Sequence, residues 1–171
     1  MIRIALFLLL ASLPPLGHAQ IAITMTANGT ELFSSPGYQI GNVDLSNASP
    51  ARRFAWDIVR EPMNGQRFGV YEAGALRVEV PLGESTPLLA DAIYNNQLVA
   101  GAIKFFGPDA QGTVVERYEI AFTGGRLQAV RPRATAENGL EYTEELSISF
   151  SVATLNHWPG TQAVIEAKPV K

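Results

Sequence analysis

The feature that most constrains the fold is a strict alternation of apolar and small polar residues at 146–152. Leucine, isoleucine, phenylalanine and valine occupy every second position there, and serine occupies each position between them. Successive side chains of a strand point to opposite faces, so this period of two predicts a strand with one buried and one solvated face. The segment 75–80 alternates in the same way, with Leu76, Val78 and Val80 on one face. The pattern favours a mainly β chain.

Short strands separated by turn residues are predicted along most of the chain. Asn28-Gly29 is a strong signal for a tight hairpin between the first two strands, and Gly124-Gly125 is predicted to be another turn. Residues 107–112 form a predicted loop between two antiparallel strands. Apart from 75–80 and 146–152, strands are expected at 21–26, 31–33, 38–45, 54–58, around 103–105, and at 114–122, 126–131 and 163–165.

One helix is predicted, from Pro87 to about Asn95. Leu88, Leu89, Ala92 and Ile93 fall at helical spacing and give it an apolar stripe. Ser85 or Thr86 can cap the first turn, and proline is well tolerated at the first helical position. The expected fold is therefore a closed or nearly closed antiparallel β-barrel, or two packed sheets, with one short flanking α-helix.

Composition bounds the classes of function. The 171 residues are 47% hydrophobic and 17% charged, which suits a globular domain with a real core. The net charge of −3 argues against a nucleic-acid partner, because phosphate binding normally needs a basic surface. The absence of cysteine excludes disulfides, a catalytic thiol and thiolate metal sites.

The N-terminal residues 1–19 have the pattern of a secretory signal peptide. A basic Arg3 precedes an apolar run at 4–13, and the segment ends in Gly17-His18-Ala19. The run is short for a membrane span, which takes about 20 residues, so no stable membrane insertion is expected. Cleavage after Ala19 would leave 20–171 as a single domain, secreted or periplasmic in a bacterium. The competing interpretation is a buried N-terminal helix or strand.

Candidate chemistry is sparse. His157 could serve a secreted hydrolase, but no Gly-x-Ser-x-Gly pattern accompanies it, so a strand-end role is favoured. Glu144 and Glu145 are neighbours on a strand and should point to opposite faces, one inward and one outward. Trp56 is interpreted as a core residue, with an exposed interface anchor as the alternative. No catalytic residue, cofactor or metal site is predicted.

Basic residues concentrate in two places, and two interpretations of them remain open. They are either solvated strand faces or ionic contacts to another subunit or to an acidic cargo. The residues are Arg52, Arg53, Arg126, Arg131 and Arg133.

An irregular loop precedes the strand at 75–80. Residues 60–67 read Arg-Glu-Pro-Met-Asn-Gly-Gln-Arg, in which proline removes a hydrogen-bond donor and Asn-Gly tolerates a positive φ. This loop, the alternating strand, Ser85-Thr86-Pro87-Leu88-Leu89 and the strand at 103–106 occur in an order that resembles the haemolysin-coregulated protein (Hcp) family, the tube protein of type VI secretion. The closing strands at 118–120, 128–130 and 144–150 resemble that family too. The resemblance covers most of residues 21–166.

The resemblance implies barrels that associate into hexameric rings, and rings that stack into a tube. It places the contact to the neighbouring ring on a loop whose residues here are Glu61, Pro62, Asn64, Gly65, Gln66 and Arg67. Partners would be copies of the chain and effector or spike proteins. The leader departs from the family, whose tube assembles from the cytoplasm, so an exported variant is expected. The alternative is a monomeric secreted binding module.

Overall fold

The structure is a computed structural model that describes residues 20–60, 71–135 and 141–166. Within those ranges the chain forms 14 strands and one helix, α1 (Thr86–Tyr94). The N-terminal strands are β1 (Gln20–Ala27), β2 (Thr30–Glu31), β3 (Gln39–Ile40), β4 (Val43–Asp44), β5 (Ala48–Ala51), β6 (Arg53–Ala55) and β7 (Ile58–Arg60). The later strands are β8 (Tyr71–Ala73), β9 (Leu76–Pro81), β10 (Val99–Pro108), β11 (Val114–Thr135), β12 (Glu141–Ser149), β13 (Val152–His157) and β14 (Thr161–Glu166).

The main strands form a closed antiparallel barrel. β1 pairs with β10, β10 with β11, β11 with β12, β12 with β9, and β9 with β6. The barrel closes because β5, which is separated from β6 by Arg52 alone, pairs with the other side of β1. Between them, the N–H of Arg52 donates to the carbonyl of Glu79 at 2.8 Å. The predicted mainly β fold is confirmed, and closure satisfies strand edges that would otherwise be open.

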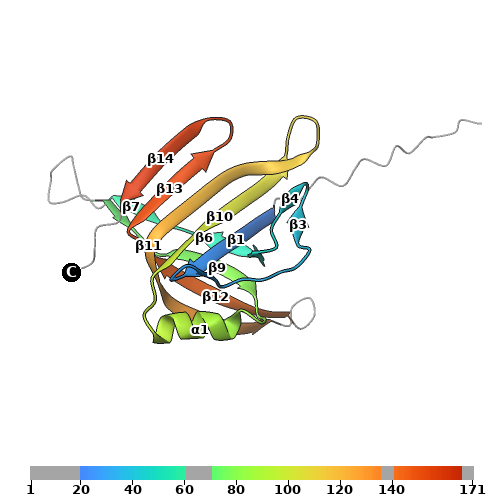
Figure 1. Cartoon of the computed structure of the whole chain (residues 1–171). Helices are drawn as coiled ribbons and strands as arrows, with labels where there is room; N and C mark the ends of the chain where they lie inside the picture. Colours follow the sequence, from blue (N-terminus) through green and yellow to red (C-terminus); the bar gives the residue numbers. More distant parts are fainter. Residues whose placement is uncertain (1–19, 61–70, 136–140, 167–171) are drawn as a thin grey trace, which may run out of the picture.

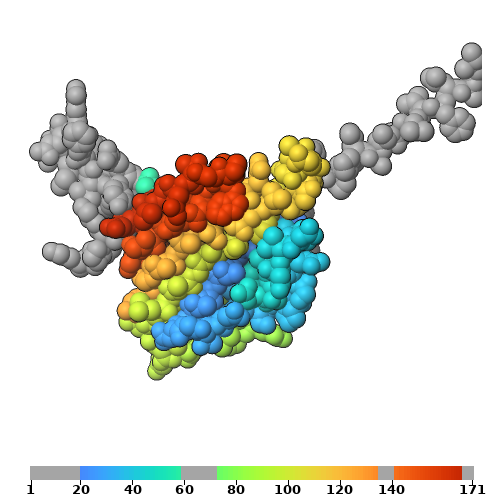
Figure 2. Space-filling view, turned by 45° about the horizontal axis from the view of Figure 1, so that its top comes forward, coloured from blue at the N-terminus to red at the C-terminus, as the bar shows by residue number. Residues whose placement is uncertain are grey.

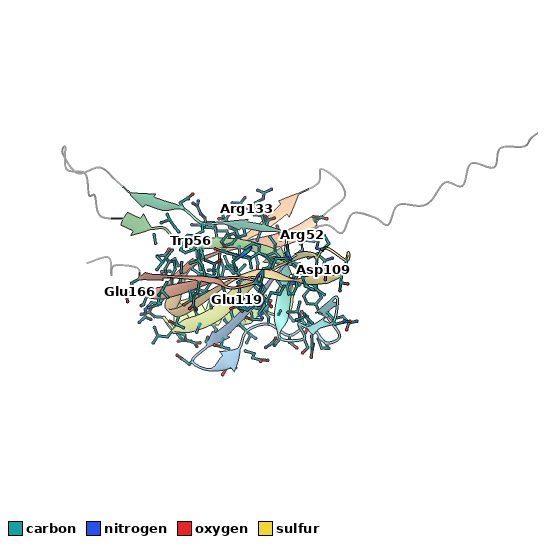
Figure 3. All side chains as sticks on the ribbon, turned by 90° about the horizontal axis from the view of Figure 1, so that it is seen from above. Arg52, Trp56, Asp109, Glu119, Arg133 and Glu166 are labelled. Atoms are coloured by element: carbon teal, nitrogen blue, oxygen red, sulfur yellow. The ribbon has the colours of Figure 1, made fainter. Side chains whose placement is uncertain are left out.

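The barrel has two walls and two additions (Figure 1). One wall contains β1, β10 and the first half of β11, and the β13–β14 hairpin extends it by pairing with that half of β11. The other wall contains β6, β9, β12 and the second half of β11. Seen from above, the walls form two layers with side chains between them (Figure 3). Helix α1 lies at the end of the molecule away from the β13–β14 hairpin (Figure 1).

β11 belongs to both walls because it bends at Gly124-Gly125. The predicted turn there is wrong: the strand runs without interruption from Val114 to Thr135. Gly124 has φ +60, and a Cβ on Gly125 would lie 2.4 Å from the carbonyl oxygen of Ser149. Glycine therefore permits a bend within one strand, with β12 and β13 following it as a nearly continuous partner.

The core is filled by rows of side chains that cross several strands. Ile23, Ile103, Ile120 and Leu155 are successive partners across β1, β10, β11 and β13, and the first three are fully or almost fully buried. The apolar face predicted at 75–80 is confirmed, since Leu76, Val78 and Val80 lie in this cluster, as do Leu146, Ile148 and Phe150. The single strand predicted over 146–152 is wrong in its extent, because β12 ends at Ser149 and β13 begins at Val152. Ser147, on the face expected to be solvated, is only 8% exposed.

A second, smaller cluster lies on the outside of the first wall. Ile40 and Leu45 cover Ala22, Ala48 and Phe106 there. The single strand predicted at 38–45 is wrong, because Gly41 takes φ +58 and splits the segment into β3 and β4, a hairpin of two-residue strands. The Asn28-Gly29 hairpin is confirmed, with Ala27 paired to Thr30 and positive φ at both turn residues.

The predicted helix is confirmed, with its start one residue earlier at Thr86. Leu89 and Ala92 are buried against the barrel, whereas Leu88 is 48% exposed and does not belong to the buried stripe. Ser85 occupies the N-cap position but makes no side-chain capping hydrogen bond, so that part of the prediction is wrong. The Thr86 hydroxyl instead accepts from the N–H of Gly83 and donates to Glu144.

Trp56 packs against the main core cluster although it is only partly buried. Its ring lies edge-on to Phe150, with ring centroids 5.5 Å apart. The indole N–H donates to the carbonyl of Gly74 at 3.1 Å. This contact satisfies the polar end of the side chain while the ring contributes to packing, in agreement with the core interpretation.

Candidate assembly surfaces

The predicted contact loop lies between two short strands. Its residues Glu61, Pro62, Asn64, Gly65, Gln66 and Arg67 lie outside the described residues. β7 and β8, which flank it, pair antiparallel with Ile58 opposite Ala73. The side chain of Ile58 is 46% exposed, so an apolar group is available to a partner at the base of this hairpin.

A charged surface covers the outside of the second wall, and we call it the arginine face. It consists of Arg53 on β6, Arg77 and Glu79 on β9, Glu145 on β12, and Arg131 and Arg133 on β11. The strand register brings Arg53 opposite Glu79, Glu79 opposite Glu145, and Glu145 opposite Arg131. A hollow of about 110 Å³ lies among Arg53, Arg77, Glu79 and Glu145.

Each arginine of this face has a carboxylate partner in the same chain. Glu145 accepts from Arg131 at 3.2 Å and from Arg133 at 2.9 Å. Arg77 binds Asp57 at 2.6 Å, and Arg53 lies 3.8 Å from Glu79. The arginine side chains are 47% to 77% exposed. Ion pairs in such solvated positions contribute little to stability.

The structure therefore separates the basic residues named from the sequence. Arg53, Arg131 and Arg133 lie together on the arginine face, and Arg133 is labelled on its layer in Figure 3. Arg52 pairs with Glu141 at 3.0 Å, and Arg126 donates to the carbonyl of Asn96 beyond α1. Both earlier interpretations, a solvated face and an ionic contact surface, fit this arrangement.

The outside of the first wall is different, and we call it the small-residue face. Thr24, Ala102, Ala121 and Thr154 form one row of partners across β1, β10, β11 and β13, and all four are partly buried. Figure 2 shows this wall as adjacent diagonal bands, from β14 and β13 through β11 and β10 to β1. This row therefore carries no long side chain, and a hollow of about 190 Å³ lies beside Thr24 at the edge formed by β1 and β10.

A polar row lies beside the small residues. Lys104 places its Nζ 3.1 Å from Glu116 Oε2 and 3.4 Å from Glu119 Oε2. Asn156 donates to Glu119 at 2.9 Å, and Gln162 donates to Asn156 at 3.1 Å, so the row crosses four strands. The three charged side chains are only 17% to 25% exposed. Burial acts to lower the pKa of Lys104, but the hydrogen bonds and charges of Glu116 and Glu119 outweigh it and raise that pKa.

Glu144 and Glu145 point to opposite faces, as predicted. Glu145 lies on the arginine face, whereas Glu144 is 0% exposed and lies on the inner side of β12 opposite Val80. Thr86 donates to its Oε1 at 3.1 Å, and its Oε2 has no hydrogen-bond partner in the part of the chain that the structure describes. Burial raises the pKa of Glu144, and the Thr86 hydrogen bond lowers it by less.

No protein-family model matches the sequence, and no match to a curated protein is found. Solved structures do match the barrel. A crystal structure of an Hcp protein is 14% identical with a TM-score of 0.76, and the match covers 90% of this chain and 100% of that one. The secreted protein Hcp3 from Pseudomonas aeruginosa is 12% identical with a TM-score of 0.72, over 88% of this chain and 99% of that one. The chain has the Hcp fold.

A third match extends the same fold to a protein described as a type VI secretion system effector from Yersinia pestis. It is 15% identical with a TM-score of 0.59, and the match covers 85% of this chain and 99% of that one. At these identities the likeness concerns the fold alone. The sequence resemblance to the Hcp proteins is thus confirmed at the level of the Hcp fold.

The sequence reasoning missed the polar row of this Hcp-fold barrel. Lys104 sits between Ile103 and Phe105 in an otherwise apolar strand, and that isolated charge was a signal that an outward neighbour should neutralise it. Glu119 is outward on the next strand, at a position that the alternation assigned correctly. Pairing the two needed the register of β10 on β11, which the sequence does not specify.

The remaining features considered in the sequence are His157, a metal site and a membrane span. His157 is exposed at the end of β13, and its ring is tilted against Tyr118 with centroids 6.4 Å apart. Among the described residues, no group of three or more His, Asp or Glu side chains is placed to hold a metal ion. No helix within 20–60, 71–135 or 141–166 is long and apolar enough to cross a membrane. That the chain is not an enzyme stays a prediction, as does the signal peptide at 1–19.

Proposed function

We propose that the chain is a structural subunit that assembles into rings, and stacked rings, like the tube component of type VI secretion. The observation that carries this proposal is the extent of the match: the barrel covers 100% of an Hcp chain with a TM-score of 0.76. The likeness therefore extends along the whole of that chain and is not limited to a shared fragment. A head-to-tail contact between such barrels closes into a ring when its rotation divides the circle, and the resemblance makes a homohexamer the expected size.

The proposed stacking contact is the segment between β7 and β8, with Glu61, Pro62, Asn64, Gly65, Gln66 and Arg67 as contact residues. It is supported by its place in the sequence between β7 and β8, which pair with each other, and by the exposed Ile58 on β7. Effector or spike proteins are the proposed further partners, bound inside a ring or at the end of a stack.

The proposed location is outside the cytoplasm, in the periplasm or secreted, with residues 1–19 removed as a signal peptide and 20–171 forming one barrel domain. The leader pattern in the sequence supports it. Expression of the full gene, cell fractionation and N-terminal sequencing test it. A mature chain that begins near Gln20 in the exported fraction supports export, and an uncleaved cytoplasmic chain contradicts it.

Assembly is tested on purified mature protein by sedimentation velocity and negative-stain electron microscopy. We expect rings, and stacks of rings at high concentration. The double variant Gly65→Glu with Arg67→Glu introduces bulky acidic groups into the proposed stacking contact, so it should keep rings and lose stacks. Gln111→Glu, in the exposed loop after β10, is the control and should assemble like the wild type. A chain that remains monomeric at high concentration contradicts the proposal.

A second candidate is a monomeric secreted binding module that keeps the barrel and lacks assembly. One observation favours it: Arg53, Arg77, Arg131 and Arg133 each have a carboxylate within the chain and need none from a neighbouring subunit. Under this alternative the wild type and the double variant Gly65→Glu with Arg67→Glu both sediment as a single monomeric species.

A further inference from the structure

Glu144 is a carboxyl group enclosed where β12 meets the start of helix α1. Its side chain is 0% exposed and shares the inner face of the sheet with Val80 and Leu146, which are also fully buried. An ionised carboxylate needs hydrogen bonds or a counter-charge to remain in such a place, because removing it from water is costly.

Of the two carboxyl oxygens of Glu144, only Oε1 forms a hydrogen bond with a described residue. The N–H of Gly83 donates to Thr86 Oγ1 at 3.2 Å, and Thr86 Oγ1 donates to Glu144 Oε1 at 3.1 Å. Among residues 20–60, 71–135 and 141–166, nothing forms a hydrogen bond with Oε2. The polar contact between Glu144 and α1 is therefore made by the hydroxyl of Thr86, the first residue of the helix.

The charged groups on the elements around Glu144 have other partners. On β9, Arg77 and Glu79 lie on the arginine face, as do Arg131 and Arg133 on β11. On α1, Asp91 accepts from Asn95 and Gln97 at the far end of the helix, and Glu84 before the helix is exposed. Within the part of the chain that the structure describes, no cation lies within ion-pair distance of Glu144.

We propose that Glu144 is a proton-binding site that couples the docking of α1 on the barrel to pH. The neutral carboxyl group holds the N-terminal end of α1 through Thr86. Ionisation places an uncompensated charge between β12 and α1, and the N-terminal turn of the helix moves away so that water can reach Oε2. The proposal stands independently of the assembly function.

The sign of the pH dependence follows from the burial. Because burial raises the folded-state pKa of Glu144, the folded state binds this proton more tightly than the unfolded state does. The resulting stability is fully present below the ordinary glutamate pKa of about 4.3 and is lost as pH rises through the folded-state pKa.

Urea unfolding of the wild type and of Glu144→Gln across a pH series tests this. Glutamine keeps the shape of a neutral carboxyl group and does not ionise. We expect its midpoint relative to the wild type to rise with pH, by about half a molar of urea between acid and neutral conditions. Glu145→Gln is the matched control on the opposite face, and its midpoint relative to the wild type should not rise. A constant difference between Glu144→Gln and the wild type at every pH overturns the proposal.

A direct titration covers the case in which Glu144→Gln does not fold. In wild-type protein, carbon-13 NMR of the glutamate carboxyl groups should show one resonance that titrates above the rest. The amide signals of Leu89 and Ala92 in α1 should change with the same midpoint. Thr86→Val removes the hydroxyl that favours the ionised form, so it should move that midpoint to higher pH. Glutamates that all titrate together, or α1 signals that do not follow, contradict the proposal.

Discussion

The two walls of the barrel place charge on their outer surfaces in different ways. On the arginine face the arginine side chains are 47% to 77% exposed, although their partners Glu79 and Glu145 are only 18% and 24% exposed. In the polar row beside the small-residue face, Lys104 and its two glutamates are 17% to 25% exposed. The walls therefore differ in the cation, which is solvated on the arginine face and partly dehydrated in the polar row. Breaking the ion pairs of the polar row should cost far more than breaking those of the arginine face.

The largest effect is expected in the strand that carries the small-residue face. A Cβ on Gly101 would lie 2.1 Å from the carbonyl oxygen of Thr24 and 3.0 Å from Cα of Met25, so β1 and β10 would have to separate. Gly101→Val should lower the free energy of unfolding by about 3 kcal/mol or more, measured by urea denaturation. Gly83→Ala, where a Cβ meets nothing within 4 Å, is the control and should change it by less than about 0.5 kcal/mol. A well-tolerated Gly101→Val would show that the wall is not tightly paired.

An intermediate effect is expected from the polar row. Lys104→Met leaves Glu116 and Glu119 close together without their cation, and should lower the free energy of unfolding by about 2 kcal/mol. Adding Glu119→Gln to it removes part of the remaining repulsion and should recover some of that loss, which a double-mutant cycle measures. If Lys104→Met lowers the free energy of unfolding by less than about 0.5 kcal/mol, the ion pairs of the polar row contribute as little to stability as those of the arginine face.

The smallest effect on stability is expected on the arginine face. Replacing both Arg131 and Arg133 by methionine removes two exposed partners of Glu145 and should change the free energy of unfolding by no more than about 0.5 kcal/mol. The same variant has a second readout, sedimentation velocity. If the face contacts a neighbouring subunit, assembly weakens while stability is kept. A large loss of stability would mean that the ion pairs of this face stabilise the fold. The two walls would then not differ in how much their charged residues contribute to stability.

Much of this fold could be predicted because local patterns and the final structure agree. The alternation at 75–80 and 146–152 marks strands whose apolar faces are buried in the barrel, and the helix near Pro87 has the expected extent. The prediction failed at a glycine pair, because glycine occurs both in turns between strands and at bends within a strand. Gly124-Gly125 has the composition of a turn, but in the structure it permits a bend and a close approach to Ser149 within one strand.

The candidate surfaces were harder to predict because they depend on which strands become neighbours. Alternation placed Glu119 on the outer side of its strand, but the register that brings Lys104 to Glu119 is a property of the assembled sheet. Glu144 could be assigned to one of two faces from its neighbour Glu145. That no described residue bonds to its Oε2 depends on how the elements around it pack, which the local sequence does not specify.

The bend in β11 has a consequence for how the molecule comes apart. Its first half is hydrogen-bonded to β10 and β13, and its second half to β12, so one continuous backbone is shared by the two layers. Peeling this strand from one layer disrupts the ladder of the other as well. We therefore expect denaturant to melt the whole barrel in a single cooperative transition, with amides on both sides of Gly124 exchanging their hydrogens at the same slow rate.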